Sequence, residues 1–266
     1  MKSKYVLFLF LPLLLACNSG PVEYPESDTQ AVELIDQLIQ NYGGERYAQS
    51  KIEFDFRDKS YGSLRLGGEY IYARIFEQEG KLYHDLLSNY GFSREIDGKP
   101  EDLPKPDQAK YTRSVNSVIY FALLPYGLND AAVIKQYLGE SELEGRAYHK
   151  IRVTFRQEGG GEDHDDVFVY WLSKENLSMD YFAYGYHTDG GGTRFRKAYN
   201  KRVVGGITFQ DYINYKGSDD FDQVDNMDEL FSSGKLEELS RIELKNIYAS
   251  EINEDDFHPD QLKRSS

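Results

Sequence analysis

The sequence contains almost no cysteine. Only one of its 266 residues is Cys, so the chain cannot form an internal disulfide or a zinc or iron–sulfur site with several cysteines. It also lacks a positive charge balance, since 45 acidic and 31 basic residues give a formal charge of −14. This charge argues against nucleic acid as a partner and against electrostatic docking on anionic lipid.

The sequence offers no hydrophobic run that predicts a membrane-spanning helix. The apolar run from Tyr5 to Leu15 has 11 residues and contains Pro12, whereas a spanning helix needs about 20. Lys2 and Lys4 precede the run. A positive start followed by a short apolar core is typical of a secretory signal segment, here residues 1–16.

The only cysteine follows this segment directly. The sequence Leu-Leu-Ala-Cys, ending at Cys17, resembles the bacterial lipobox, in which the cysteine receives lipid and becomes the first residue of the mature protein. The mature chain would have 250 residues and a charge of −16. Residues 17–27 would be the lipidated cysteine and its tether. Asn18, by analogy with lipoprotein sorting, favours the outer membrane facing the periplasm.

The usual signs of an enzyme are also missing. The sequence has no Gly-x-Ser-x-Gly elbow and no spare cysteine nucleophile, and no Gly-rich phosphate loop follows a strand and opens a helix. The predicted helices are too few and too clustered for the alternating units of a TIM barrel. We therefore expect a protein that is not an enzyme and that has no organic cofactor.

What the sequence does contain is 38 aromatic residues and clear periodic patterns. Apolar residues recur with helical spacing at two places and alternate with polar ones elsewhere. A capping-box spacing, Ser27 to Gln30, opens the first helix. The pattern predicts helices at about 28–42, 107–124 and 227–233, strands within 50–98 and 135–215, a last strand near 240–248, and a frayed polar tail over 251–266.

These elements predict a mainly β (α+β) fold, a curved antiparallel half-barrel of about ten or eleven strands closed by two main helices. The order of elements resembles the lipoprotein carriers of LolA, LolB and LppX type, and the resemblance covers residues 28–250 as one domain. A closer resemblance, to an uncharacterised lipoprotein family of the Bacteroidota, is carried by FDFRDK at 54–59, SVIYFALLPYGL at 117–128 and YHTDGGG at 186–192.

The carrier resemblance implies an apolar space between sheet and helices that holds acyl chains. Aromatic side chains of the alternating segments would line it. The alternative is a packed β core without a cavity, because alternation shows which residues share a face but not whether that face is filled. The candidate residues are Phe54, Phe56, Tyr70, Tyr72, Phe121, Tyr170, Phe182, Tyr184, Phe195 and Tyr199.

Two glycine-rich acidic loops, at 158–166 and 187–192, form a second candidate site. In a simple meander both loops lie at the same end of the sheet. Oxygen-rich ligand sets favour Ca²⁺ or Mg²⁺, and two histidines with a carboxylate favour Zn²⁺. The alternative is a pair of solvated hairpin tips. The candidate ligands are Asp163, His164, Asp165, His187 and Asp189.

Four arginines near these loops have two interpretations. Arg152, Arg156, Arg194 and Arg196 would either meet an anionic head group or pair with carboxylates on neighbouring strands. The abundance of carboxylates favours the pairing.

The favoured hypothesis is a membrane-anchored periplasmic protein that binds or carries a lipid or lipoprotein acyl chain and is attached to the outer membrane through Cys17. One alternative is a metal-binding module or metal-dependent hydrolase at the two loops. The other is a structural or interaction subunit of an envelope complex. The sequence does not identify a protein partner.

Overall fold

The structure is a computed structural model that describes residues 25–159, 164–187, 190–217 and 221–262. Its helices are α1 (Thr29–Tyr42), α2 (Lys105–Ala122) and α3 (Met227–Ser232), and its 3-10 turns are η1 (Gly44–Gln49), η2 (Tyr126–Asn129), η4 (Phe221–Asn226), η5 (Glu254–Asp256) and η6 (Pro259–Leu262). Within the described ranges, no helix combines the length and the hydrophobicity needed to span a bilayer.

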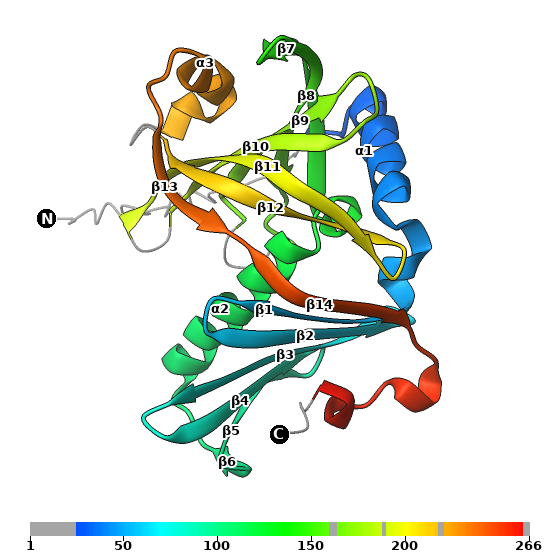
Figure 1. Cartoon of the computed structure of the whole chain (residues 1–266), viewed down its shortest axis with the longest axis vertical. Coiled ribbons are helices and arrows are strands. Elements are labelled where there is room, and N and C mark those ends of the chain that lie inside the picture. The colour runs from blue at the N-terminus through cyan, green and yellow to red at the C-terminus, as the bar shows by residue number, and fades with distance from the viewer. Residues whose placement is uncertain (1–24, 160–163, 188–189, 218–220, 263–266) are drawn as a thin grey trace, which may run out of the picture.

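The strands form two antiparallel sheets of seven strands each (Figure 1). The first sheet has the order β14-β1-β2-β3-β4-β5-β6 and the second has the order β13-β12-β11-β10-β9-β8-β7. In the first sheet the strands are β1 (Ser50–Phe56), β2 (Lys59–Leu66), β3 (Glu69–Gln78), β4 (Lys81–Ser88), β5 (Gly91–Ile96), β6 (Lys99–Glu101) and β14 (Leu244–Glu251). In the second they are β7 (Val133–Leu143), β8 (Arg146–Phe155), β9 (Val167–Ser173), β10 (Met179–Tyr186), β11 (Gly192–Val204), β12 (Ile207–Lys216) and β13 (Glu237–Ile242).

One stretch of chain joins the two sheets. Strand β13 pairs with β12, and β14, which begins after the single residue Glu243, pairs with β1. Figure 1 shows this orange-to-red ribbon passing from the upper sheet to the lower one. The buried carboxylate of Asp211 fixes the crossing point, since it accepts hydrogen bonds from the Leu244 amide at 3.0 Å and from Arg202 at 3.0 Å. The sheets therefore form one open, bent β surface.

The expected fold class, mainly β with an antiparallel half-barrel and two main helices, is confirmed. The strand number of ten or eleven is wrong, because the described residues contain fourteen strands. The single strand predicted near 240–248 is in fact β13 and β14, which belong to different sheets. Alternation continues across Glu243, so sequence periodicity does not reveal that the pairing partner changes there.

The main core fills the space between the two sheets. Its members come from α1, α2 and the inner faces of both sheets, where the inner face is the one toward α2. Strand β9 is buried on both faces, as its continuous apolar sequence predicts. Tyr170 joins the main core, whereas Trp171 lies on the outer face in a second cluster beneath α3 and η4.

Helix α1 packs against β7 and β12. The predicted capping box is wrong, because Asp28 is the N-cap and makes no side-chain cap hydrogen bond. The residues before the helix bind the edge strand β7 instead: the Lys135 amide donates to Ser27 Oγ at 3.0 Å and the Tyr137 amide donates to Asp28 Oδ2 at 2.7 Å. They thus satisfy backbone donors on an otherwise open sheet edge.

The chain after β14 covers the outer face of the first sheet. Ile252 and Leu262 are buried against Leu64 and Ile71. Leu262 lies so close to β2 that a Cβ on Gly62 would come within 2.6 Å of its side chain. The prediction of a frayed tail is therefore wrong as far as Leu262, because the apolar outward residues of β2 and β3 require a cover.

Polar groups fasten the N-terminal half of α2 to the first sheet. The fully buried Asp85 carboxylate accepts from Arg94 Nε at 2.6 Å and from Arg74 Nε at 2.9 Å. Arg74 also donates to Ser114 of α2 at 2.7 Å, and the Arg94 guanidinium lies 3.8 Å from the centre of the Tyr111 ring. Two buried guanidinium groups thus depend on one carboxylate.

We expect Asp85→Asn to lower the free energy of unfolding by about 3–5 kcal/mol, because it leaves two buried cations without their counter-charge. Urea denaturation measures the change. Asp58→Asn is the matched control, since Asp58 pairs with Lys59 while its side chain stays 76% exposed, and it should leave the urea midpoint unchanged. Equal midpoints for both variants would show that the buried cluster does not hold α2.

Candidate functional site

The C-terminal end of α2 lies between the two sheets. The Phe121 ring stacks on Phe182 of β10 at 5.9 Å between centroids, and the Tyr120 ring meets Phe168 of β9 edge-on at 6.2 Å. Residues 116, 119, 120 and 123 border one hollow, and residues 117, 118, 121 and 122 border another. Since these two sets lie on different faces of a helix, the end of α2 has a hollow on each side.

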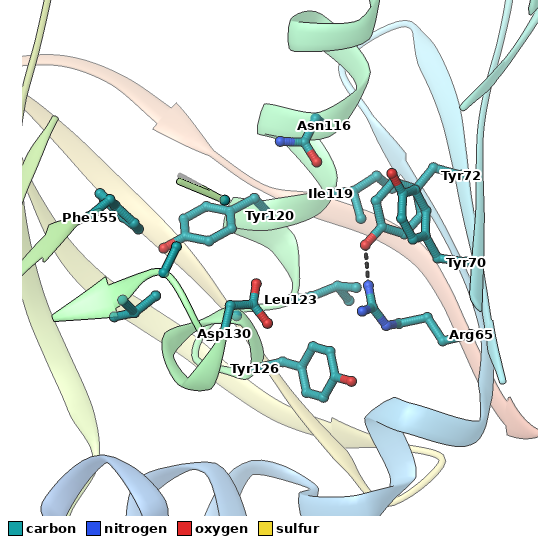
Figure 2. A pocket seen from close by; sticks show the side chains of 14 residues that line it. Arg65, Tyr70, Tyr72, Asn116, Ile119, Tyr120, Leu123, Tyr126, Asp130 and Phe155 are labelled. Carbon is teal, nitrogen blue, oxygen red and sulfur yellow. Dashed lines mark hydrogen bonds between the residues drawn. The ribbon is translucent and has the colours of Figure 1, made fainter. Parts of the chain in front are cut away.

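The first hollow, which we call the tyrosine pocket, has a volume of about 420 Å³ (Figure 2). Its polar side chains are four tyrosines, one arginine, one aspartate and one asparagine. The residues that line it are Arg65, Tyr70, Tyr72, Asn116, Ile119, Tyr120, Leu123, Tyr126, Gly127, Asp130, Ala132, Val133, Phe155 and Gly159.

Arg65 is held among the rings of this pocket. Its Nη1 donates to the Tyr72 hydroxyl, and its guanidinium lies 4.6 Å from the centre of the Tyr126 ring. Burial raises the pKa of Tyr72 to about 12, although the positive charge of Arg65 acts in the opposite direction. The Tyr72 phenol therefore stays neutral at physiological pH.

Asp130 stands on the wall formed by the α2–β7 connection. Loss of water around it raises the pKa of its carboxyl above the usual value, while the positive charges of Arg65 and Lys135 oppose that change. The pocket thus presents both a cation and a carboxyl group. It has no single sign of charge with which to select a charged ligand.

The second hollow, which we call the arginine cleft, has a volume of about 310 Å³. It opens between the sheets at β1, β14 and β10–β13. The residues that line it are Phe56, Arg57, Ser117, Val118, Phe121, Ala122, Tyr184, Arg196, Gln210, Tyr212, Asn214, Ser240, Ile242 and Leu244.

The ten predicted cavity residues fall into three groups. Five border the hollows, with Tyr70 and Tyr72 in the tyrosine pocket and Phe56, Phe121 and Tyr184 in the arginine cleft. The aromatic inner face is therefore neither one large cavity nor a closed core. The end of α2 fills its centre and leaves room on both sides.

Three others, Phe54, Tyr170 and Phe182, are fully buried in the main core. The remaining two lie on the outer face of the second sheet. Phe195 is opposite Ala183 in the pairing and packs on Trp171 and Phe231 in the second cluster. Tyr199 points the same way as Phe195 and donates to Glu243 at 2.9 Å.

The predicted metal loops are only partly described. Strand pairing puts the β8–β9 and β10–β11 connections at the same end of the second sheet, as expected. His164 lies 3.3 Å from Asp165, and His187 directly follows β10, whereas Asp163 and Asp189 lie outside the described residues, as does Cys17. Among the residues that the structure describes, no three His, Cys, Asp or Glu side chains are grouped to hold a metal ion.

A family model described as a family of unknown function, DUF6503, matches residues 2–244. The chain belongs to this family. No curated protein matches it.

One solved structure shows a fold that this DUF6503 chain shares, and two others align with lower scores. A DUF1329 family protein from Desulfovibrio piger aligns with a TM-score of 0.52 at 10% identity, over 90% of this chain and 100% of the other. A LolA superfamily protein from Nitrosomonas europaea aligns at 0.49 with 10% identity, over 87% and 99%. A putative outer membrane lipoprotein-sorting protein domain from Vibrio parahaemolyticus aligns at 0.45 with 11% identity, over 88% and 99%.

The sequence predictions include Tyr70, Tyr72 and Tyr184 of the two hollows, and they include Arg196 as one of four arginines that would meet an anionic head group or pair with carboxylates. They do not include Arg65, Tyr126 or Asp130 as site residues. The strand register places Arg196 opposite Phe182 and therefore on the inner face of the second sheet. Knowledge of this register would have identified Arg196 as a residue of the cleft. No sequence signal marks Arg65, since its position depends on where η2 brings Tyr126.

The buried hydroxyl of Tyr47, whose ring stacks on Tyr126 of the tyrosine pocket at 5.1 Å between centroids, has no hydrogen-bond partner in the structure. We expect Tyr47→Phe to leave the free energy of unfolding unchanged or to raise it by up to ~1 kcal/mol, because it removes an unsatisfied polar group. The control is Tyr42→Phe. The Tyr42 hydroxyl donates to Gln210 and accepts from the Met179 amide, so its loss should cost about 1–3 kcal/mol. Chemical denaturation compares the two variants, and a larger loss for Tyr47→Phe than for Tyr42→Phe would contradict this account.

Proposed function

We propose that this DUF6503 protein is a lipid-anchored lipoprotein of the cell envelope that binds a lipid or an acyl chain in the arginine cleft, between the two sheets and beside α2. The observation that carries the proposal is the apolar wall of this cleft. Phe56, Val118 and Phe121 form one part of it, and Ile242 and Leu244 of the joined strands form the other.

The size and nature of the cleft support a small hydrophobic ligand. Its volume of about 310 Å³ lies at the lower end of the range for small-molecule pockets. Each methylene group that moves from water to such a wall contributes about 0.8 kcal/mol. One acyl chain, rather than a folded protein, matches these dimensions.

Attachment to the membrane is proposed from the sequence around Cys17. Acylation of this cysteine would hold the protein at the membrane, because several acyl chains together make a stable anchor. The mature charge of −16 does not favour binding to anionic lipid through charge alone. The residue after Cys17, Asn18, supports the outer membrane facing the periplasm.

We propose a binding role rather than a catalytic one. The groups of the arginine cleft are arginines, amides and hydroxyls, and the cleft has no carboxylate, histidine or cysteine for proton transfer or nucleophilic attack. The structure of the described residues offers no specific observation in favour of the metal-dependent alternative or of a purely structural subunit.

The first test fills the cleft. Ala122→Phe places a ring where the ligand would lie, so we expect the full-length variant to lose at least tenfold of the lipid that co-purifies with the wild type, as measured by mass spectrometry of gently purified protein. Lys110→Phe adds the same ring at an exposed position on the same helix and should retain the lipid. Absence of lipid from the wild type, or equal lipid on both variants, would overturn the proposal.

The second test addresses the anchor. Cys17→Ser removes the acyl acceptor, so we expect the full-length variant to incorporate no labelled palmitate and to leave the membrane fraction after a salt wash. Ser19→Ala, two residues away, should remain acylated and membrane-bound. Labelled palmitate on the Cys17→Ser protein would show that the lipobox is not the attachment site.

A further inference from the structure

The arginine cleft contains a buried guanidinium group without a carboxylate partner. Arg196 of β11 is only 7% exposed and lies on the inner face of the second sheet. Its Nη2 donates to the Tyr184 hydroxyl at 2.9 Å. Its Nε and Nη1 have no hydrogen-bond partner in the structure. Two of its three nitrogens are thus buried donors without a partner, on a side chain that lines the cleft.

The other buried arginines of this protein are arranged differently. Arg74 and Arg94 share Asp85. Among the residues that the structure describes, no carboxylate forms an ion pair with Arg196. The positive charge of Arg196 is stabilised by aromatic rings instead, since the guanidinium lies 4.2 Å from the centroid of the Phe121 ring and 5.1 Å from that of the Tyr184 ring. Ring faces stabilise a cation only in part, and a buried charge without a counter-charge is costly.

Arg152 does pair with a carboxylate, but with Asp225 of η4 at 3.0 Å on the outer face rather than with one on a neighbouring strand as predicted. For Arg196 the predicted pairing with a carboxylate is wrong. The difference follows from the face of the sheet, because η4 and α3 bring Asp225 and Asp228 to the outer side and none of the 14 residues of the cleft is acidic.

The charge of the cleft differs from that of the whole protein. The chain carries 45 acidic residues against 31 basic ones, yet the cleft has two arginines and no Asp or Glu. Of these two arginines, Arg57 is exposed and Arg196 is buried. Asn214 adds a buried Oδ1 that also has no hydrogen-bond partner. The charged side chains that line the cleft are therefore both positive.

We propose that the ligand of the arginine cleft is a single-chain amphiphile with an anionic head, whose head pairs with the guanidinium of Arg196 and whose tail lies along Val118, Phe121, Ile242 and Leu244. This inference rests on the proposed function and adds the charge of the ligand to it. Hydrogen bonds between a guanidinium and an anion are the strongest of their kind, and a dry, ring-lined site strengthens them further.

The test compares three ten-carbon ligands on the full-length protein by isothermal titration below their micelle concentrations. Decanoate, decanol and decyltrimethylammonium share one tail and differ in head charge. A hydrogen bond to a charged group contributes a net 1.5–3 kcal/mol, so decanoate should bind about 10- to 100-fold more tightly than decanol. Decyltrimethylammonium should bind more weakly than decanol.

Three variants assign the preference to a residue. Arg196→Met replaces the charged side chain with an apolar one of similar length, so this variant should bind decanoate and decanol equally. Arg196→Lys keeps the positive charge and should retain part of the preference for decanoate. Arg194→Met, two residues away on the same face of β11 and outside the cleft, should bind as the wild type does. A thermal melt of each variant verifies that it is folded.

The outcomes separate the two proposals. Equal binding of decanol and decanoate to the wild type would overturn the anionic head and leave the hydrophobic ligand standing. Absence of binding by any ten-carbon ligand would overturn the proposed function itself. Acetate binding as tightly as decanoate would show a head-only site and overturn the amphiphile, and a preference that survives in Arg196→Met would assign the head to another group and overturn the role of Arg196.

Discussion

The packing of the last turns of α2 between two β-sheets is the contact on which the rest of this structure depends. Phe121 and Ile119 prevent the inner faces of the sheets from meeting, and the rings of β9 and β10 pack against the helix instead of against the first sheet. A helix end is narrower than the aromatic surface it covers. The two hollows are the parts of that surface that α2 cannot reach.

The connection between the sheets gives this arrangement its geometry. Because β13 and β14 are separated by one residue, the edge of the second sheet continues into the edge of the first, and the angle between them is set at Glu243. Asp211 and Arg202 bind the backbone at that point. The arginine cleft lies where the joined strands pass α2, so Ile242 and Leu244 line it from both sides of the bend.

The two halves of α2 are held in place by different interactions, ion pairs for the first half and apolar packing for the second. Its first half is mostly polar and binds the first sheet through the cluster at Asp85, in which every guanidinium has a carboxylate. Its second half is apolar and contacts rings from both sheets. Arg196 lies in the second environment and has ring faces in place of an anion. This contrast within one molecule gives the cleft its chemical character.

The sequence by itself determined the local elements. Alternation and helical spacing gave the fold class, both main helices and the burial of β9 on both faces, because side-chain periodicity reports which faces of an element are apolar. Only the tertiary structure decided the pairing change at Glu243, the outward position of Phe195 and the isolation of Arg196. Each of these depends on which segment lies opposite in space, and contacts between residues far apart in the chain leave no periodic trace in either segment.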